Sequence, residues 1–384
     1  MSLLRRAQSN APNDVNIPRL QAQAWLAQND PQKALEAIEA ATELEKELGI
    51  EEGKGDRNLK VVGGRAGLAA KDYETARLYA VKVRHREPDS PRAYLLVAES
   101  YKQAGDMRRA IGALEYYADR HPEDFAIKKT LAGLYREDGQ IDKALAVMSK
   151  SNDNSDIRVT ISQIELLLES NRKEQAQLLA QQAVGSSQNV NELLAVAQVF
   201  AQADESLDAQ NWGERALVVS NVTNKAAVHS FLGRIYLRRA SQENNSAFYD
   251  KARTQFKMVL ETHPNDVVAG NNLAWLLATK FNRPDEAVLI VDRVRGNAKI
   301  EQLAPAFIDT MIDCYHRAGQ IDKAKATAKE AIKHFPQEAP LLYRYGLLLS
   351  ASEPNQAKQM LSRAVQLGLP AEDEAEAKRQ LANL

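Results

Sequence analysis

Alanine recurs along this chain at a spacing of about 34 residues, each time within a short motif of the same form. Two full copies read Ala-Gly-Asp-Met-Arg-Arg-Ala, ending at Ala110, and Asp-Gly-Gln-Ile-Asp-Lys-Ala, ending at Ala144. The equivalent alanines elsewhere are Ala34, Ala76, Ala176, Ala209, Ala252, Ala287, Ala324 and Ala357. A period of this size indicates one repeated supersecondary unit, whose copies must stack because a single copy cannot bury its own apolar face.

Other positions recur in phase with this alanine. A small residue precedes the alanine at Gly64, Ala98, Ala132 and Ala197. An aromatic residue follows the small residue at Tyr101, Tyr135, Phe200 and Tyr315. A proline follows the alanine at Pro88, Pro122, Pro264 and Pro336. Small residues let two helix backbones approach closely, and proline ends or follows a helix. Gly105, Gly139 and Gly319 suit a left-handed turn after a first helix, where Asn171 and Asp204 stand in the degenerate units near 157–221. Each unit is therefore predicted to be two antiparallel helices.

These positions together resemble the tetratricopeptide repeat over residues 15–370. The resemblance implies an all-α fold, a right-handed superhelical solenoid of about ten helix-turn-helix hairpins whose first helices line a concave groove. Residues 1–14 are expected to be an N-terminal tail or cloning-derived, and residues 371–384 a polar capping helix. The expected units lie near 15–48, 57–90, 91–124, 125–156, 157–189, 190–223, 226–266, 267–300, 305–338 and 339–370.

Two insertions interrupt the period. Residues 47–56 follow the first unit and are expected to extend a helix and then form a loop. Residues 241–246 are expected to lengthen the turn between the two helices of the seventh unit. Each insertion is either a tolerated surface loop, because loops absorb extra residues at little cost, or a protrusion that touches a partner.

Charge and cysteine content exclude several classes of function. The 384 residues include 50 Lys and Arg against 51 Asp and Glu, so no global attraction to nucleic acid is expected. Cys314 is the one cysteine, which excludes an internal disulfide. No apolar run is long enough for a spanning helix, so no direct membrane insertion is expected. The compartment stays open between the cytoplasm and, if a native signal was trimmed, the periplasm or envelope.

The residues that could carry chemistry fit structural roles better. His85, His121, His263 and His334 recur near the closing proline, and no histidine or cysteine pair has a metal-ligand spacing. Gly53-Lys54-Gly55 lacks the rest of a phosphate loop, and no Gly-x-Ser-x-Gly motif occurs. We therefore expect no enzyme, no cofactor and no metal site.

The repeat register places some charged and aromatic side chains in the groove. The partner-binding candidates are Arg65, Arg92, Lys102, Lys129, Arg136, Arg158, Asn271 and Trp275. Glu99, Glu137, Glu165, Glu169, Arg234, Arg238, Asp309, Asp313, His316, Arg317 and Tyr343 are placed there too. The early groove is read as mildly basic and suited to an acidic or C-terminal peptide. Reversal of Arg92, Lys102, Lys129 and Arg136 to Glu is expected to abolish partner capture without loss of helicity. Trp275 is either a groove anchor or part of the hairpin core.

Known groove chemistries fit poorly. A chaperone-type carboxylate clamp would need Asn where Gly133 stands, and of an asparagine ladder only Asn272 matches. The stretch Asn271-Asn272-Leu273-Ala274-Trp275, with Arg283-Pro284-Asp285-Glu286-Ala287, resembles bacterial exopolysaccharide-linked and PEP-CTERM-associated repeat proteins, although Met311-Ile312-Asp313 departs from their pattern.

The expected function is a non-catalytic scaffold or adaptor that binds a partner peptide or protein in the groove, in bacterial envelope or exopolysaccharide assembly. The alternatives are a peptide-sensing regulatory module and an accessory domain of a larger enzyme or secretion complex. A homo-oligomer is left open.

Overall fold

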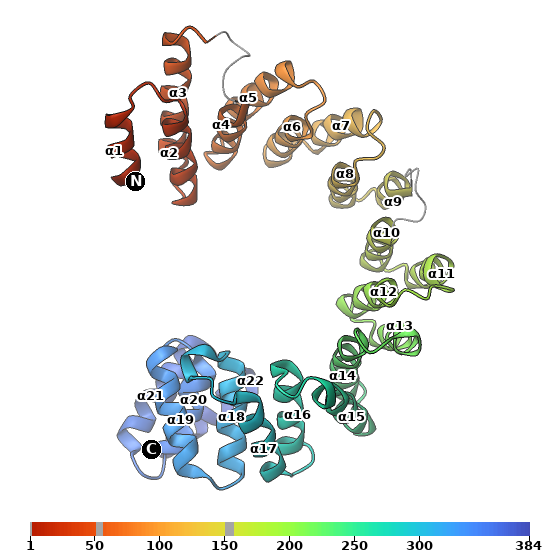
Figure 1. Cartoon of the computed structure of the whole chain (residues 1–384), viewed down its shortest axis with the longest axis vertical. Coiled ribbons are helices and arrows are strands. Elements are labelled where there is room, and N and C mark those ends of the chain that lie inside the picture. Colours follow the sequence, from red (N-terminus) through yellow and green to blue (C-terminus); the bar gives the residue numbers. More distant parts are fainter. Residues whose placement is uncertain (1, 51–56, 150–156) are drawn as a thin grey trace. The chain divides into compact units, whose positions relative to one another are not determined.

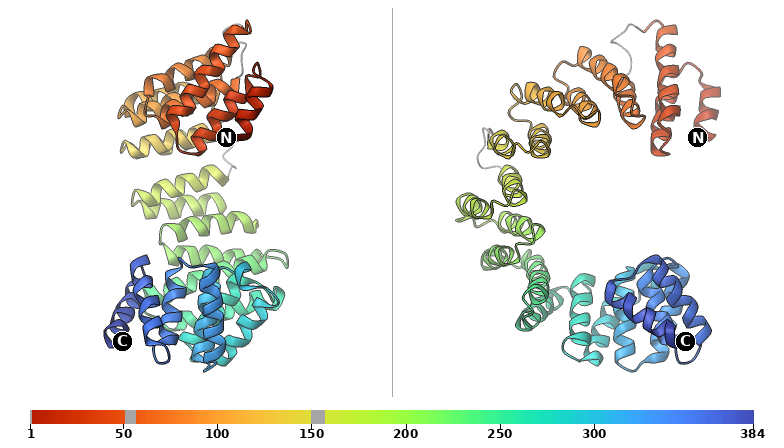
Figure 2. Two further views of the ribbon diagram at one scale, coloured as in Figure 1. Left: turned by 90° about the vertical axis from the view of Figure 1, so that its left-hand side faces the viewer. Right: turned by 180° about the vertical axis from the view of Figure 1, so that it is seen from behind.

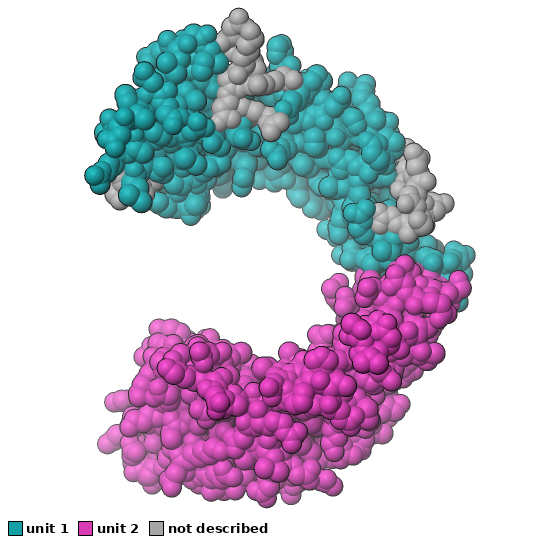
Figure 3. All heavy atoms as spheres, in the orientation of Figure 1, with its two compact units in different colours: residues 1–183 teal, residues 184–384 magenta. Residues whose placement is uncertain are grey.

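The structure, a computed structural model, describes residues 2–50, 57–149 and 157–384, and every regular element in these ranges is helical (Figure 1). The helices form two compact units, residues 1–183 and 184–384 (Figure 3). The all-α repeat fold expected from the sequence is confirmed.

Unit 1 is a run of helical hairpins whose consecutive helices pack antiparallel (Figure 2). Its helices are α1 (Ser2–Asn10), α2 (Asn16–Ala27), α3 (Pro31–Glu47), α4 (Arg57–Ala69), α5 (Tyr73–Arg86), α6 (Pro91–Gln103), α7 (Met107–Ala118), α8 (Phe125–Glu137), α9 (Ile141–Ser149), α10 (Ile157–Glu169) and α11 (Lys173–Val184), the last of which ends at the unit boundary. Hairpins α2–α3, α4–α5, α6–α7 and α8–α9 each pack on the next, and first helices also touch one another. Residues 1–14, expected to be a tail, include helix α1, which contacts α2.

Unit 2 continues the same pattern. Its elements are α12 (Val190–Gln202), α13 (Ser206–Val219), α14 (Lys225–Gln242), α15 (Ala247–Thr262), α16 (Val267–Thr279), α17 (Pro284–Arg295), the 3₁₀ turn η1 (Ile300–Gln302), α18 (Pro305–Arg317), α19 (Ile321–His334), α20 (Ala339–Leu349), α21 (Pro354–Leu367) and α22 (Ala371–Asn383). Ala377 of α22 is buried against the apolar cluster of α20 and α21, so α22 covers the last hairpin.

The repeated alanine is a fully buried position of the repeat. Each of the ten has no exposed surface, and they are Ala34, Ala76, Ala110, Ala144, Ala176, Ala209, Ala252, Ala287, Ala324 and Ala357. All ten lie in the second helix of a hairpin within the first two turns: nine are the fourth residue of the helix, as Ala110 is in α7, and Ala252 is the sixth residue of α15. A larger side chain there would have to displace the facing helix, because helical interiors are packed at crystal density.

The glycines of α4 show where the backbones come closest. A Cβ added at Gly67 would lie 2.7 Å from the backbone nitrogen of Ala76, inside the same hairpin. A Cβ at Gly64 would instead lie 2.7 Å from Cδ1 of Leu96, in the next hairpin. The expectation that Gly64 marks a helix crossing therefore holds between hairpins, whereas the crossing within the hairpin is at Gly67.

The two insertions are accommodated differently. Helix α3 is 17 residues long and reaches Glu47, residues 48–50 follow it in a turn, and residues 51–56 of the first insertion lie outside the described residues. The second insertion does not lengthen the turn, as the sequence suggested, but adds to the helix: α14 has 18 residues, against 13 for α16 and for α18, and α15 starts at Ala247. Arg239 stabilises this extra turn, because its Nε donates to Glu243 at 2.6 Å and its guanidinium lies over the Phe248 ring.

Candidate functional site

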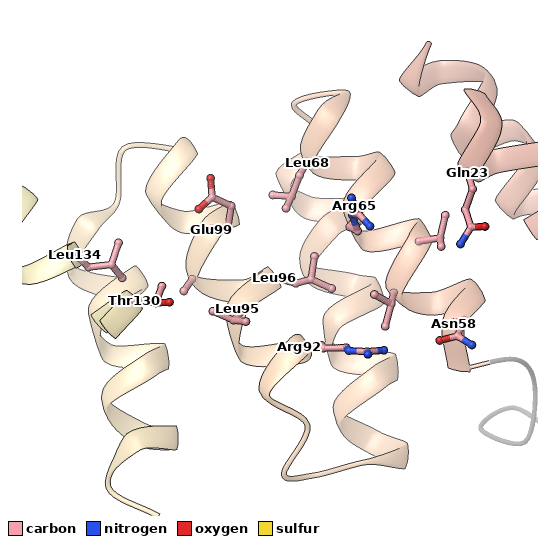
Figure 4. A pocket seen from close by; sticks show the side chains of 13 residues that line it. Gln23, Asn58, Arg65, Leu68, Arg92, Leu95, Leu96, Glu99, Thr130 and Leu134 are labelled. Carbon is pink, nitrogen blue, oxygen red and sulfur yellow. The ribbon is translucent and has the colours of Figure 1, made fainter. Parts of the chain in front are cut away.

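Unit 1 holds a cavity of about 630 Å³ lined by residues of α2, α4, α6 and α8, all of them first helices of hairpins (Figure 4). Its apolar lining comes from Val61, Val62, Leu68, Leu95, Leu96, Ala98 and Leu134. Its polar lining comes from Gln23, Asn58, Arg65, Arg92, Glu99 and Thr130. The volume and the apolar majority with a few polar groups are typical of a ligand site in a protein.

Helical spacing explains why these side chains meet. In α6, Arg92, Leu95, Leu96 and Glu99 are separated by three, one and three residues, so they share one face of the helix. Helix α4 presents Val61, Val62, Arg65 and Leu68 in the same way. Gly64 has no side chain to fill the space between the two helices, and Leu96 occupies it and forms part of the cavity floor.

Arg65 and Arg92 are the free cations of this cavity. Both are exposed, and neither has a hydrogen bond, an ion pair or a ring contact within the described part of the chain. Figure 4 shows the Arg92 side chain extending toward Asn58, with Arg65 lying between Leu68 and Asn58. An exposed guanidinium with no internal partner keeps all five of its N–H donors for a ligand.

Glu99 is the acidic group of the cavity. Its Oε1 accepts a hydrogen bond of 2.7 Å from Nε2 of Gln103, which is a neutral amide. Among the described residues no cation pairs with it. Figure 4 places Glu99 on the side where α8 contributes Leu134. The cavity therefore carries unpaired positive charge and unpaired negative charge at different places.

The other cations expected to make the early groove basic are already paired. Nζ of Lys102 lies 2.7 Å from Oε1 of Glu137, and an Arg136 nitrogen lies 2.7 Å from an oxygen of Glu169. Lys129 stands 3.9 Å from Glu165. Each pair joins one first helix to the next, from α6 to α8 or from α8 to α10, and we name the three pairs the ion-pair ladder. Carboxylates thus balance the positive charge along the ladder, so the excess positive charge of the early groove lies at Arg65 and Arg92.

Arg158 is not free either. Its guanidinium lies 4.9 Å from the centre of the Phe125 ring, and it has at least one further interaction. This leaves Arg65 and Arg92 as the two of the six basic candidates that the structure brings to one cavity without partners.

The remaining candidates, Asn271 and Trp275, belong to α16 in unit 2. Trp275 is 36% exposed, so its ring is not part of the hairpin core, and Nζ of Lys280 lies 5.4 Å from the ring centre. Oδ1 of Asn271 is buried without a hydrogen-bond partner in the described ranges. Tyr343, placed in the same patch by the sequence register, is only 4% exposed and packs in the core of the last hairpins.

A buried charge cluster in unit 2 was only partly visible in the sequence. Arg344 of α20 donates to Asp309 and to Asp313 of α18, both at 3.0 Å, and Arg317 donates to Asp313 at 2.7 Å. Burial raises the pKa of Asp309, and Arg344 opposes this shift. Asp313 is only 5% exposed, so it is not free for a groove ligand as the register suggested. No local motif marks Arg344, because its partners stand more than thirty residues earlier.

Residues elsewhere in the chain whose side chains are often reactive are buried in the packed helices. Cys314 has no exposed surface, and burial raises the pKa of its thiol to about 12. His229 is buried, with Nδ1 2.6 Å from Oε1 of Gln255. In the parts of the chain that the structure describes, no group of three or more His, Cys, Asp or Glu could hold a metal ion. No described helix has the length and apolar character needed to cross a membrane.

Comparison with known proteins adds to this picture. Two family models described as tetratricopeptide repeat match residues 98–156 and 311–338. The search of the curated proteins gave no match.

Solved structures show distant likeness. A tetratricopeptide repeat protein from Parabacteroides merdae is 18% identical over 75% of this chain and 96% of its own, with a TM-score of 0.41. The APC/C assembly of Cut9 and Hcn1 contains a chain that is 13% identical over 96% of this chain and 76% of its own, with a TM-score of 0.43. YrrB, described as a TPR protein with an unusual peptide-binding site, is 17% identical over 52% of this chain and 97% of its own, with a TM-score of 0.40. At these identities and TM-scores the likeness says nothing about the site.

The repeated alanine buried in every hairpin and the two family matches lead to one conclusion, that this chain carries tetratricopeptide repeats.

Proposed function

We propose that the chain is a non-catalytic protein-interaction scaffold that holds a segment of a partner protein in the unit 1 cavity. The observation that carries this proposal is the cavity itself, open to solvent, floored by Leu95 and Leu96 and edged by two unpaired arginines. Stacked repeats offer extended surfaces of this kind, on which a peptide can lie across several first helices.

The apolar floor supplies the affinity. Leu95 is half-buried and Leu96 almost fully buried, so a partner side chain laid over them would remove further apolar surface from water. Burial of one large apolar side chain contributes roughly 1.5–3 kcal/mol. Arg65 and Arg92 would orient the bound segment, since each can form charge-assisted hydrogen bonds to a carboxylate.

Site-specific photo-crosslinking tests this function. A photoreactive residue at Thr130, which is exposed and lines the cavity, should crosslink the full-length chain to a defined partner in a lysate of the native host. The matched control carries the same residue at Arg108, which is exposed on α7 and does not line the cavity. Equal crosslinking from both positions, or none from Thr130, would remove the cavity as the binding surface.

We further propose the process in which the scaffold acts, which is bacterial envelope or exopolysaccharide assembly. It is supported by the resemblance of residues 271–287 alone. The identity of the crosslinked partner tests it directly, because a cytosolic metabolic protein at the cavity would contradict an envelope role.

A further inference from the structure

The unit 1 cavity has an arrangement of unpaired charge that distinguishes it from the rest of its face. Arg65, Arg92 and Glu99 all line it, and none has an oppositely charged partner in the described residues. Outside the cavity, the neighbouring cations of α6 and α8 are neutralised by the ion-pair ladder. An anion approaching this face would therefore meet uncompensated positive charge at the cavity and not along the ladder.

The unpaired charges are separated within the cavity. Arg65 and Arg92 lie nearer to Asn58, while Glu99 lies on the side of the cavity to which α8 contributes Leu134 (Figure 4). Leu95 and Leu96 come from the same helix face, in the sequence between Arg92 and Glu99. The order along α6 is thus cation, apolar pair, anion.

We infer that the partner segment bound here has the complementary order: one or more carboxylates, then a large apolar side chain, then a lysine or arginine. The carboxylates would lie at Arg65 and Arg92, the apolar side chain over the leucines, and the cation at Glu99. This inference rests on the proposed function and adds the chemistry and the direction of the bound segment.

Electrostatic cost gives the preference its physical reason. A bound segment displaces water from the cavity, so any of the three charged groups left without a counter-ion loses part of its hydration. A segment that is acidic at both ends leaves a carboxylate against Glu99, and one that is basic at both ends places cations against two arginines. The repulsion between these like charges disfavours segments of the wrong charge order, whereas a segment of the complementary order avoids it.

Four synthetic peptides of equal length test the inference by fluorescence anisotropy with the full chain. Each has three blocks: Glu–Leu–Lys, Glu–Leu–Glu, Lys–Leu–Lys and Glu–Ala–Lys. The Glu–Leu–Lys peptide is expected to bind about tenfold more tightly than each of the others. Its affinity should fall with added salt, because its charge contacts are partly exposed.

Two variants of the chain provide the matched test, and circular dichroism checks that each keeps its helices. The Glu99→Lys variant should shift the preference from Glu–Leu–Lys to Glu–Leu–Glu. The Arg65→Glu, Arg92→Glu double variant should lose Glu–Leu–Lys binding. The control Arg108→Glu makes the same charge change outside the cavity, at an exposed arginine, and should leave all four affinities unchanged.

Several outcomes would overturn the inference. They are equal affinity for the Glu–Leu–Lys and Lys–Leu–Lys peptides, an unchanged preference in the Glu99→Lys variant, and failure of all four peptides to bind. If a partner still crosslinks at Thr130 while the peptides show no preference by charge, the scaffold function stands and only the charge order fails. If the crosslink is also absent, both proposals fall.

Discussion

At the scale of single residues, the backbone after the first helix adopts a left-handed conformation in the nine hairpins from α2–α3 to α18–α19, and not in α20–α21. Gly105, Gly139 and Gly319 have φ of 81°, 77° and 72°. Asn171 and Asp204, where the repeat lacks its glycine, have φ of 59° and 64°. Asparagine and aspartate tolerate this conformation better than other non-glycine residues, so the units that look degenerate in sequence keep the turn.

Substitution of Gly105 and of Gly112 by alanine should change the free energy of unfolding in opposite directions. Gly105→Ala should destabilise the fold by about 1 kcal/mol, because the left-handed conformation is unfavourable for alanine. No atom of the described residues beyond the two chain neighbours lies within 4 Å of the added Cβ, so a steric clash does not contribute. Gly112→Ala, inside α7 with equally open space, should stabilise by about 0.5–1 kcal/mol through helix propensity. Urea denaturation followed by circular dichroism measures both, and effects of the same sign would contradict the argument.

At the scale of helices, charged side chains join neighbouring hairpins in two different settings. The ion-pair ladder is solvent-exposed, with Lys102 and Glu137 exposing 33% and 38% of their side chains. The cluster of Arg344 with Asp309 and Asp313 is buried to a greater extent, with Asp313 exposing 7% of its side chain. Exposed pairs contribute little to stability, whereas removing one partner of a buried pair leaves an uncompensated charge.

This difference predicts the cost of two similar substitutions. Arg344→Met should destabilise by roughly 3–5 kcal/mol, because Asp309 then loses its buried counter-ion and Asp313 keeps only the more exposed Arg317. Lys102→Met, the matched control in the ladder, should change stability by less than about 1 kcal/mol. Chemical denaturation of both variants at neutral pH measures the difference, and similar losses would show that the Arg344 cluster is more hydrated than its burial indicates.

The destabilisation caused by Arg344→Met should depend on pH, because the cluster contains Asp309. The native pKa of Asp309 is raised above the ordinary value of 3.8, mainly by burial. A raised native pKa means that this carboxyl favours the folded state when protonated, a contribution present below 3.8 and lost as the pH rises through the native pKa. In the Arg344→Met variant Asp309 loses the cation that lowers its pKa and takes up a proton more readily still, so the destabilisation relative to the native chain should shrink as the pH is lowered.

At the scale of the whole molecule, each compact unit has its own apolar core. Unit 1 is built around clusters such as that of Leu114, Leu131 and Met148. Unit 2 buries larger side chains, among them Phe256, Phe307 and Tyr315. In a repeat array each hairpin contacts only its neighbours, so opening of one region need not unfold the rest.

The reactivity of Cys314 reports whether unit 2 has opened. Its thiol has no exposed surface and burial raises its pKa from 9.0 to about 12, so a thiol reagent should not react with the folded chain at neutral pH. One equivalent should react once urea opens unit 2, because this is the one cysteine. Since the native pKa is raised, the thiol also costs stability as the pH rises from 9.0 toward 12. Rapid labelling of the native chain would contradict the packing around α18.

The repeat, the hairpin and the buried alanine in each hairpin can be predicted from the amino-acid sequence alone. These features follow from spacing along one chain, since a helix places residues on a fixed face and a small residue is needed wherever two backbones meet. The left-handed turns at Gly105, Gly139 and Gly319 followed in the same way. Trp275 and Tyr343 show the limit of that register, because one is at the surface and the other in the core.

Which charges on the first helices are free depends on the way the hairpins pack in three dimensions. Lys102 and Glu137 are 35 residues apart, and Arg136 and Glu169 are 33 apart, so each pair depends on how one hairpin stacks on the next. The same stacking seats Leu96 against Gly64, leaves Arg65 and Arg92 unpaired beside it, and buries Asp313 under Arg344. Helical spacing fixes the face on which a side chain lies, but its counter-ion comes from another helix, and the packing of the hairpins places that helix.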